Sequence, residues 1–268
     1  MNRIDATFER LRREGKSALI PFLTIGDPDL AASAELIAVC AAAGADMIEL
    51  GVPYSDPLAD GPVIQRASER ALQNRVTLED VVRTAAEARR LGADIPYILF
   101  SYYNPVLQYG LDRFFKLLEE HDISGLIVPD LPLEEDGELR DRAEAAGIHL
   151  IPLVAPTSHE RIARIVARAR GFVYCVSSLG VTGMRSEFHA TIDDFLAAVR
   201  NASPVPICVG FGISSREQVL RFEGKTDGVI VGSAIVRKIE EALPLLRDPG
   251  KRAEGVRQVE QFIRSLRV

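Results

Sequence analysis

The sequence is short of the residues that build disulfide frameworks, metal sites and lysine-based catalysis. Its three cysteines, Cys40, Cys175 and Cys208, are an odd number without Cys-x-x-Cys spacing. Each lies in an apolar stretch, which predicts buried thiols in a reducing compartment. The few histidines include no pair at the spacing of metal ligands. No lysine ends a predicted strand, which argues against a Schiff-base aldolase or a lysine-held pyridoxal phosphate.

Tryptophan is absent, and no apolar run approaches the roughly 18 residues that a membrane span requires. Residues 1–16 are charged throughout and lack the apolar centre of a signal peptide. The net charge of −6 gives no electrostatic reason to bind nucleic acid or anionic lipid. We therefore expect a cytoplasmic protein that binds neither nucleic acid nor membranes.

Short apolar runs alternate with longer amphipathic runs along the whole chain. The apolar runs are rich in Ile, Val and Leu without polar alternation, as in parallel strands buried on both faces. They predict strands at Leu19–Ile25, Asp46–Leu50, Pro96–Ser101, Gly125–Val128, His149–Val154, Phe172–Ser177, Pro206–Val209 and Gly228–Val231. The amphipathic runs predict helices at Leu30–Ala43, Leu78–Leu91, Leu111–Glu120, Glu134–Ala146, His159–Arg168, Ile192–Arg200, Ser215–Phe222 and Arg252–Leu266.

Eight strand–helix repeats in one chain of 268 residues are typical of a (β/α)₈ (TIM) barrel, and we expect residues 1–268 to form a single such domain. Gly44, Gly92 and Gly147 each follow a helix and precede a strand, where a left-handed C-cap residue belongs. The rival architecture is an open, doubly wound sheet, but no Gly-x-Gly-x-x-Gly follows the first strand. An N-terminal helix, Asp5–Arg13, is expected to plug the bottom of the barrel.

The longest gap between predicted strands follows the second, so extra structure is expected there. This strand ends in Ile48-Glu49-Leu50-Gly51, which places Glu49 where the mouth of a barrel would lie. A carboxyl group in that dry setting can act as acid or base near neutral pH, but it could equally be a buried structural Glu held by a Tyr or an Arg. The loop that follows carries Asp56 and Asp60 between prolines, and a helix-like stretch at Val63–Leu72 comes next. Such aspartates are often only turn formers, although a long loop at the functional end favours a role in the site.

Glycines follow the last predicted strands. Gly210 and Gly212 follow the seventh, and Gly232 follows the eighth and leads into a short extra helix, Ser233–Ala242. Exposed backbone N–H groups and a helix N-terminus at these positions form the phosphate site of many barrels. The residues alone thus predict a metal-free enzyme that acts on a phosphate ester by carboxylate acid–base chemistry.

Seven motifs together resemble the tryptophan synthase alpha chain family, in the family's order and over nearly the whole chain. The longest runs from Glu49 to Gln65, Glu-Leu-Gly-Val-Pro-Tyr-Ser-Asp-Pro-Leu-Ala-Asp-Gly-Pro-Val-Ile-Gln. The others are Pro21-Phe-Leu-Thr-Ile-Gly-Asp-Pro28, Tyr102-Tyr-Asn-Pro105, Val128-Pro-Asp-Leu-Pro132, Ala155-Pro-Thr157, Gly180-Val-Thr-Gly183 and Gly210-Phe-Gly-Ile213.

The resemblance implies a lyase of tryptophan biosynthesis that splits indole-3-glycerol phosphate into indole and glyceraldehyde 3-phosphate without metal or cofactor. It implies that Glu49 is the general acid–base and that Asp60 holds the indole N–H. The substrate-binding positions that it implies are Phe22, Phe100, Ile127, Tyr174, Thr182, Gly183, Gly212, Gly232 and Ser233. The partner-facing positions are Pro53, Asp56, Asn104 and Pro132. The partner is the beta chain, which carries pyridoxal phosphate, in an α2β2 complex.

Two positions depart from the family's pattern. Ser177-Ser-Leu-Gly180 stands where many bacterial members have Ser-Arg-Ala-Gly, which concerns loop closure and signalling to the partner, and Phe100 stands where an aliphatic residue is commoner. Two alternatives remain. The chain could be a stand-alone indole-3-glycerol-phosphate lyase, or it could be a weakly active subunit that serves as an allosteric partner, although the intact pair of carboxylates argues against the second.

Overall fold

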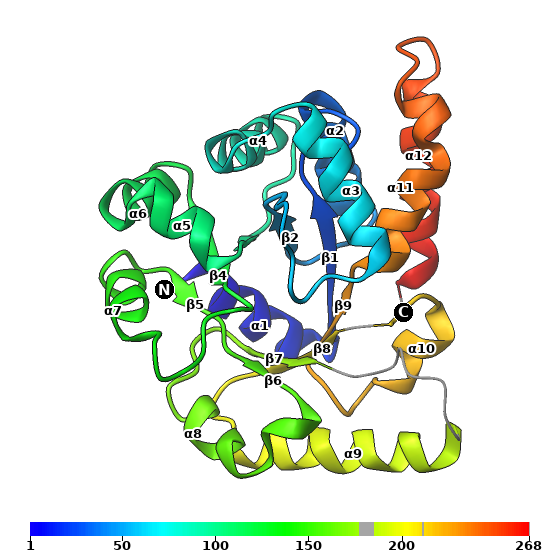
Figure 1. Ribbon diagram of the computed structural model, residues 1–268. Helices are drawn as coiled ribbons and strands as arrows, with labels where there is room; N and C mark the ends of the chain where they lie inside the picture. Colours follow the sequence, from blue (N-terminus) through cyan, green and yellow to red (C-terminus); the bar gives the residue numbers. More distant parts are fainter. Residues whose placement is uncertain (177–184, 211, 268) are drawn as a thin grey trace.

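The computed structural model, which describes residues 1–176, 185–210 and 212–267, has parallel strands at its centre and helices around them (Figure 1). All the strand pairs are parallel, and one sheet has the order β5-β4-β3-β2-β1-β9-β8-β7-β6. The strands are β1 Ala18–Thr24, β2 Ile48–Gly51, β3 Tyr97–Phe100, β4 Ile123–Ile127, β5 His149–Leu150, β6 Leu153–Val154, β7 Val173–Val176, β8 Ile207–Gly210 and β9 Gly228–Val231.

The predicted fifth strand is divided into two short strands, β5 and β6. The barrel closes at the break between them. β5 pairs with β4, whereas β6 pairs with β7, so the two ends of the sheet meet within a single stretch of chain. The break falls at Ile151 and Pro152, because proline has no N–H to donate to a ladder. The neighbouring strands still bond there: Ile151 N–H donates to Leu126 O at 2.9 Å, and Tyr174 N–H donates to Pro152 O at 2.9 Å. The predicted barrel is confirmed.

The helices follow the predicted repeats, with four differences. They are α1 Arg3–Glu14, α2 Leu30–Ala42, α3 Pro62–Gln73, α4 Leu78–Arg90, α5 Tyr103–Tyr109, α6 Leu111–Glu120, α7 Gly137–Ala145, α8 Ile162–Val166, α9 Arg185–Ala202, α10 Arg216–Arg221, α11 Ser233–Leu246 and α12 Arg252–Leu266, with a 3₁₀ turn, η1, at Pro156–Arg161. The helix α5 was not predicted, α9 begins seven residues before its predicted start, and the predicted helix His159–Arg168 begins within η1 and continues as α8. The prediction for α11 also ended before Pro244, but a proline in the last turns costs only one backbone bond, and the helix continues to the buried Leu246.

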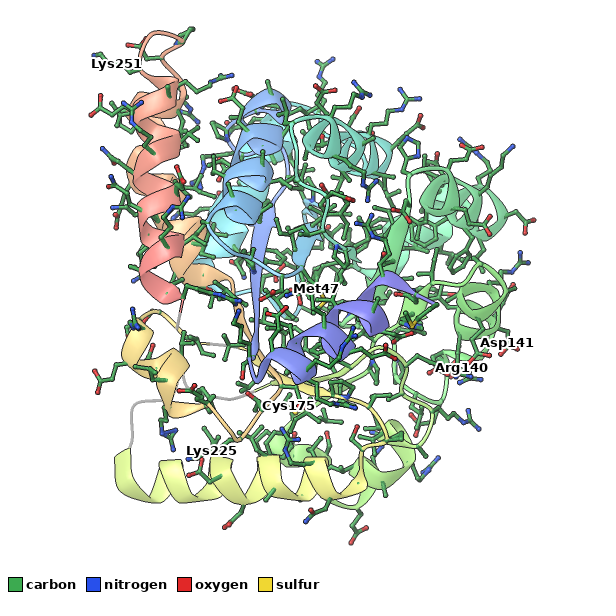
Figure 2. All side chains as sticks on the ribbon, turned by 180° about the vertical axis from the view of Figure 1, so that it is seen from behind. Met47, Arg140, Asp141, Cys175, Lys225 and Lys251 are labelled. Atoms are coloured by element: carbon green, nitrogen blue, oxygen red, sulfur yellow. The ribbon has the colours of Figure 1, made fainter. Side chains whose placement is uncertain are left out.

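The N-terminal helix closes one end of the barrel, as predicted. Ile4, Phe8 and Leu11 of α1 are buried and share one apolar cluster with Met47 and Phe172 from the barrel interior. The rings of Phe8 and Phe172 lie 5.8 Å apart. Seen from behind, α1 lies across the barrel close to Met47 (Figure 2). Because Met47 and Phe172 lie at the starts of β2 and β7, the opposite end of the barrel is left for the site.

The long gap after the second strand holds the extra structure that was expected there. Residues 52–61 form a loop without regular structure, and α3 then begins with Pro62 at its first position, where proline is favoured. The helix α4 follows and begins with a capping box of Thr77 and Asp80. In the described part of the chain, no helix is long and apolar enough to span a membrane.

Candidate active site

Glu49 lies within β2 and faces the barrel interior. It lies in register with Phe22 on β1 and Ile98 on β3. Its side chain is 1% exposed, and its Oε1 has no hydrogen-bond partner among the described residues. Burial raises the pKa of Glu49 to about 8, because the carboxylate has lost its water and its Oε1 has gained no donor among the described residues. The sequence left two interpretations of Glu49 open, a group that transfers protons and a buried structural residue held by a Tyr or an Arg. This arrangement favours the first.

Asp60 lies in the loop between β2 and α3, where it is half-buried and held by Tyr102. The Tyr102 hydroxyl accepts a hydrogen bond from Ala59 N–H at 2.9 Å and donates one to the Asp60 carboxylate. Burial raises the pKa of Asp60, and the hydrogen bond from Tyr102 opposes that rise. The Asp60 carbonyl also accepts from Gln65 Nε2 at 2.8 Å, which ties the loop to the first turns of α3. Asp60 is therefore more than a turn former.

Tyr174 on β7 brings the two acids into one site. It is buried, and its pKa is raised first by burial and then by the negative charges of Glu49 and, more weakly, Asp60. Both carboxylates are therefore close enough to Tyr174 to act on it electrostatically. A Cβ at Gly210 would come within 2.4 Å of the Tyr174 hydroxyl, so only glycine leaves room for the ring at this position. Glu49, Asp60 and Tyr174 thus share one end of the barrel.

Aromatic rings line the site and continue toward the surface. Phe22 and Phe100 meet edge to face at 5.5 Å between ring centres, and Phe100 meets Tyr102 edge to face at 6.5 Å. Tyr102 stacks on Tyr54 at 5.1 Å. Ile127, from β4, is fully buried in the interior cluster. The four predicted wall positions, Phe22, Phe100, Ile127 and Tyr174, therefore all face the barrel interior.

The predicted phosphate-binding glycines lie beside this wall. Gly232 follows β9 and directly precedes α11, whose first residue is Ser233. A Cβ on Gly232 would lie 3.5 Å from Phe22 Cβ, so the start of α11 adjoins the aromatic wall. Gly212 follows β8 with a φ of +78°, a conformation that favours glycine. A 14-residue helix with its N-terminus at the barrel mouth attracts anions, because its first N–H groups and its dipole present positive charge.

Two of the predicted positions fall outside the described residues. Thr182 and Gly183 lie in residues 177–184, and so do Ser178 and Leu179 of the segment that departs from the family's pattern. Among the described residues, no group of three His, Cys, Asp or Glu side chains could hold a metal ion.

The predicted partner-facing positions surround the mouth of the barrel. Asp56, Asn104 and Pro132 are exposed, whereas Pro53 is buried within the chain and offers little surface of its own. Asn104 lies at the start of α5, and its amide is 3.5 Å from the Tyr54 hydroxyl on the loop after β2. The loop after β2 and α5 therefore lie side by side at this end.

Tyr102 is the site residue that the sequence analysis missed. It was quoted only as part of a motif, but it is 1% exposed and bonds both Ala59 and Asp60. A signal was available, because Tyr102 follows Phe100 by two residues and side chains two apart in an extended chain share a face.

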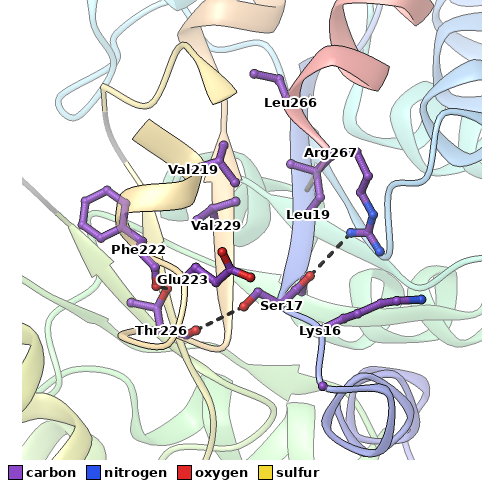
Figure 3. A pocket seen from close by; sticks show the side chains of 12 residues that line it. Lys16, Ser17, Leu19, Val219, Phe222, Glu223, Thr226, Val229, Leu266 and Arg267 are labelled. Carbon is purple, nitrogen blue, oxygen red and sulfur yellow. Dashed lines mark hydrogen bonds between the residues drawn. The ribbon is translucent and has the colours of Figure 1, made fainter. Parts of the chain in front are cut away.

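A cavity of about 90 Å³ lies at the other end of the barrel, between the starts of β1 and β9 (Figure 3). Its walls include the apolar side chains of Leu19, Val219 and Phe222. Ser17 closes one side, where its hydroxyl donates to Thr226 O at 3.5 Å. The cavity lies at the strand starts, away from Glu49, so it is separate from the site.

Comparisons with known proteins agree with this geometry. The family model for the tryptophan synthase alpha chain matches residues 8–266. The tryptophan synthase alpha chain of Geobacillus kaustophilus is 51% identical over 247 residues, which cover 92% of each chain, and that of Bacillus subtilis is 51% identical over 243 residues, 91% of each.

Solved structures show the same likeness. Tryptophan synthase subunit alpha from Legionella pneumophila matches with a TM-score of 0.85 and 36% identity, and 98% of each chain is covered. Tryptophan synthase from M. tuberculosis, in its aminoacrylate-bound form, matches with a TM-score of 0.84 and 34% identity over 99% of this chain and 98% of that one. The chain therefore belongs to the tryptophan synthase alpha chain family, the lyases that cleave indole-3-glycerol phosphate in tryptophan biosynthesis.

Proposed function

We propose that Glu49 and Asp60 divide the proton transfers of this cleavage between them. The observation that carries the proposal is the buried, incompletely bonded carboxyl group of Glu49, with its pKa near 8, in one site with the half-buried Asp60. Two acids in such different surroundings can hold and release protons at different stages of one reaction.

The reaction needs a proton at C3 of the indole and loss of a proton from the hydroxyl on the carbon attached to C3. Protonation of C3 places positive charge on the ring nitrogen. The bond between C3 and the side chain then breaks, its electrons return to the ring, and the hydroxyl becomes the aldehyde of glyceraldehyde 3-phosphate. Glu49, which holds its proton at neutral pH, supplies the first proton and can take up the second.

Asp60 stabilises the charge on the ring. Its carboxylate accepts the indole N–H, which becomes more acidic as the nitrogen gains positive charge, and Tyr102 keeps the carboxylate in place. Phe22, Phe100, Ile127 and Tyr174 enclose the ring, since flat apolar walls suit a heterocycle.

The phosphate is held at the other side of the mouth. Gly212, Gly232, Ser233 and the N-terminus of α11 bind it, and Thr182 and Gly183 complete the site. This chain holds no cofactor in the proposed reaction. Pyridoxal phosphate is carried by the beta chain alone.

The partner is a beta chain, in an α2β2 complex in the cytoplasm. Support comes from two large apolar side chains left exposed near the mouth, Leu58 at 85% and Leu107 at 51%. Leu58 lies on the loop with Asp56, and Leu107 lies on α5 with Asn104. Exposed leucines among residues proposed to face a partner are typical of an interaction surface.

The direct test is indole release from indole-3-glycerol phosphate by the purified chain, with and without an added beta chain. We expect cleavage by the chain alone and a strong increase with the partner. Cleavage that does not change when a beta chain is added would support a stand-alone lyase instead. Asp60→Asn should lose at least about 100-fold in turnover, because the negative charge that stabilises the ring nitrogen in the transition state is removed. Normal single-turnover cleavage by this variant would contradict the role of Asp60.

A further inference from the structure

Two helices begin at the two sides of the proposed substrate site and pack against each other farther along. The helix α3 begins two residues after Asp60, and α11 begins at Ser233 in the proposed phosphate site. In Figure 1 the two helices lie next to each other at the edge of the barrel. Close to their starts they share an apolar contact that includes Val63 and Val236. Farther along, the contact between them becomes ionic.

Four side chains form this ionic contact, which we call the Arg70 network: Asp27, Arg66, Arg70 and Glu240. Arg70 donates from Nε and Nη2 to the two carboxylate oxygens of Asp27, both at 2.8 Å, and from Nη1 to Glu240 Oε1 at 2.8 Å. Arg66 donates to the same Glu240 from Nε at 2.9 Å and from Nη2 at 2.8 Å. Every polar edge of the Arg70 guanidinium therefore faces a carboxylate.

The Arg70–Asp27 pair is shielded from water, whereas the side chains of Glu240 and Arg66 are partly exposed. The side chain of Arg70 is 14% exposed and that of Asp27 is 2% exposed. The hydrogen bonds from Arg66, and those from Arg70, lower the pKa of Glu240 to about 2, so this carboxylate stays charged. A bidentate arginine pair of this kind fixes direction as well as distance, which a lysine does not.

The network joins three segments that border the site. Asp27 lies in the loop between β1 and α2, Arg70 lies on α3, and Glu240 lies on α11. The end of α3 is fastened to the same loop, because Asn74 Nδ2 donates to Gly26 O at 3.1 Å and to Pro28 O at 2.6 Å. The start of α3 follows Asp60 and the start of α11 is the phosphate site, so the network spans the two helices that carry the two ends of the site.

We propose that Arg70 and Glu240 are positioning residues that set the separation between the Asp60 loop and the phosphate-binding start of α11. The substrate has to reach from one to the other, so its phosphate can hold the indole against Glu49 only if this separation is fixed. A change of about 1 Å in such a distance can cost on the order of 100-fold in rate. The proposal rests on the function proposed above.

The test compares two neighbouring residues of α11. Glu240→Ala removes the link between the helices and leaves the pair of Arg70 with Asp27 in place. Glu241→Ala is the matched control, because Glu241 is 57% exposed and pairs only with Lys238, at 3.1 Å on the same helix, among the described residues. For each variant, kcat for indole release and the inhibition constant of glycerol 3-phosphate, a probe of the phosphate site, are measured beside the unfolding midpoint.

For Glu240→Ala we expect kcat to fall at least tenfold while the inhibition constant of glycerol 3-phosphate changes less than threefold, and Glu241→Ala should match the parent chain. Arg70→Lys should have a higher kcat than Arg70→Met, because lysine keeps the positive charge. It should stay below the parent, because lysine cannot make the bidentate hydrogen bonds. A kcat of Glu240→Ala within threefold of the parent would overturn the proposal. An inhibition constant that rises in step with the loss of kcat would also overturn it, since the damage would then be to the phosphate site itself.

The parent chain, assayed first, separates this proposal from the function on which it rests. If the parent does not release indole, the proposed function is wrong and the positioning role falls with it. If the parent releases indole and Glu240→Ala does so equally well, only the positioning role is wrong.

Discussion

Two buried carboxylates lie three residues apart, one just before β2 and one within it. Asp46, just before the strand, is 5% exposed and accepts from Arg10 at 3.0 Å, Arg267 at 2.7 Å and Leu19 N–H at 3.1 Å. Glu49, the second residue of the strand, is 1% exposed, and one of its oxygens has no donor among the described residues. The two side chains are almost equally buried, but they differ in the number of hydrogen-bond donors that reach them.

The difference shows what burial does to an acid in each setting. At Asp46 the protein replaces the lost water with two guanidinium groups and a backbone N–H. The Asp46 carboxylate therefore binds α1 through Arg10, β1 through Leu19 and the C-terminal segment through Arg267. At Glu49 the water is lost without full replacement, which raises the pKa and keeps a proton available at neutral pH. The same chemical group joins distant segments at Asp46 and, in the proposed mechanism, transfers protons at Glu49.

The largest effect expected from this comparison is on catalysis. Glu49→Gln should keep the fold and lose at least about 100-fold in cleavage, because an amide cannot transfer the protons. Asp46→Asn should cleave at close to the parent rate per folded molecule. Indole release by both variants checks the contrast, and cleavage by Glu49→Gln above about a tenth of the parent rate, an effect below about 1.4 kcal/mol, would contradict it.

The reverse effect is expected for stability. Asp46→Asn should lower the free energy of unfolding by about 2 kcal/mol, because Arg10 and Arg267 lose a buried charged partner. Urea unfolding of the parent and the variant measures this difference. If Asp46→Asn is as stable as the parent chain, its ion pairs do not contribute in the way described.

The pH dependence of stability gives a third contrast. The pKa of Glu49 rises from 4.5 to about 8 on folding, so the folded state holds its proton more tightly and is disfavoured as the pH rises between these values. Relative to the parent, Glu49→Gln should therefore gain stability across this interval, by up to about 1.4 kcal/mol per pH unit. Above the upper pKa the gain should level off. Denaturant unfolding of both proteins between pH 5 and pH 9 measures it, and a constant difference over this range would refute the raised pKa.

The smallest effect concerns Tyr102, which holds Asp60 without belonging to the pair of acids. Tyr102→Phe keeps the ring contacts with Phe100 and Tyr54 and removes only the hydroxyl that bonds Ala59 and Asp60. We expect kcat to fall by about fivefold to tenfold, the typical loss for one hydrogen bond of about 1 kcal/mol. Steady-state kinetics measure the loss of kcat, and an unchanged unfolding midpoint would show that the loss is not caused by damage to the fold. An unchanged kcat would show that the Tyr102 hydroxyl has no role in the site.

The sequence predicted the barrel and the position of Glu49 for the same reason. An apolar run without polar alternation indicates a strand buried on both faces, and a single acid at its carboxyl end falls at the mouth by topology alone. The glycines after the last strands were found by the same rule. These inferences need only the order of residues along the chain.

What the sequence did not predict depends on contacts between distant segments. The role of Tyr102 follows from its hydrogen bonds to a loop some forty residues earlier in the chain. The helix α5 was missed because Tyr103–Tyr109 is short and its first residue follows an N-cap without a side-chain hydrogen bond. The division of the fifth predicted strand into β5 and β6 likewise depends on distant contacts, because each pairs with a different neighbouring strand. Pro152 marks the position of the break between them.

The helix α1 has a consequence for how the enzyme exchanges material with its surroundings. Ile4, Phe8 and Leu11 fill the barrel at the starts of the strands, so this end offers no path to Glu49. In the proposed reaction, indole would therefore leave by the same end through which its precursor entered. A protein that captures indole before it diffuses away therefore has to cover that rim, and its approach would also control when the next substrate molecule can enter.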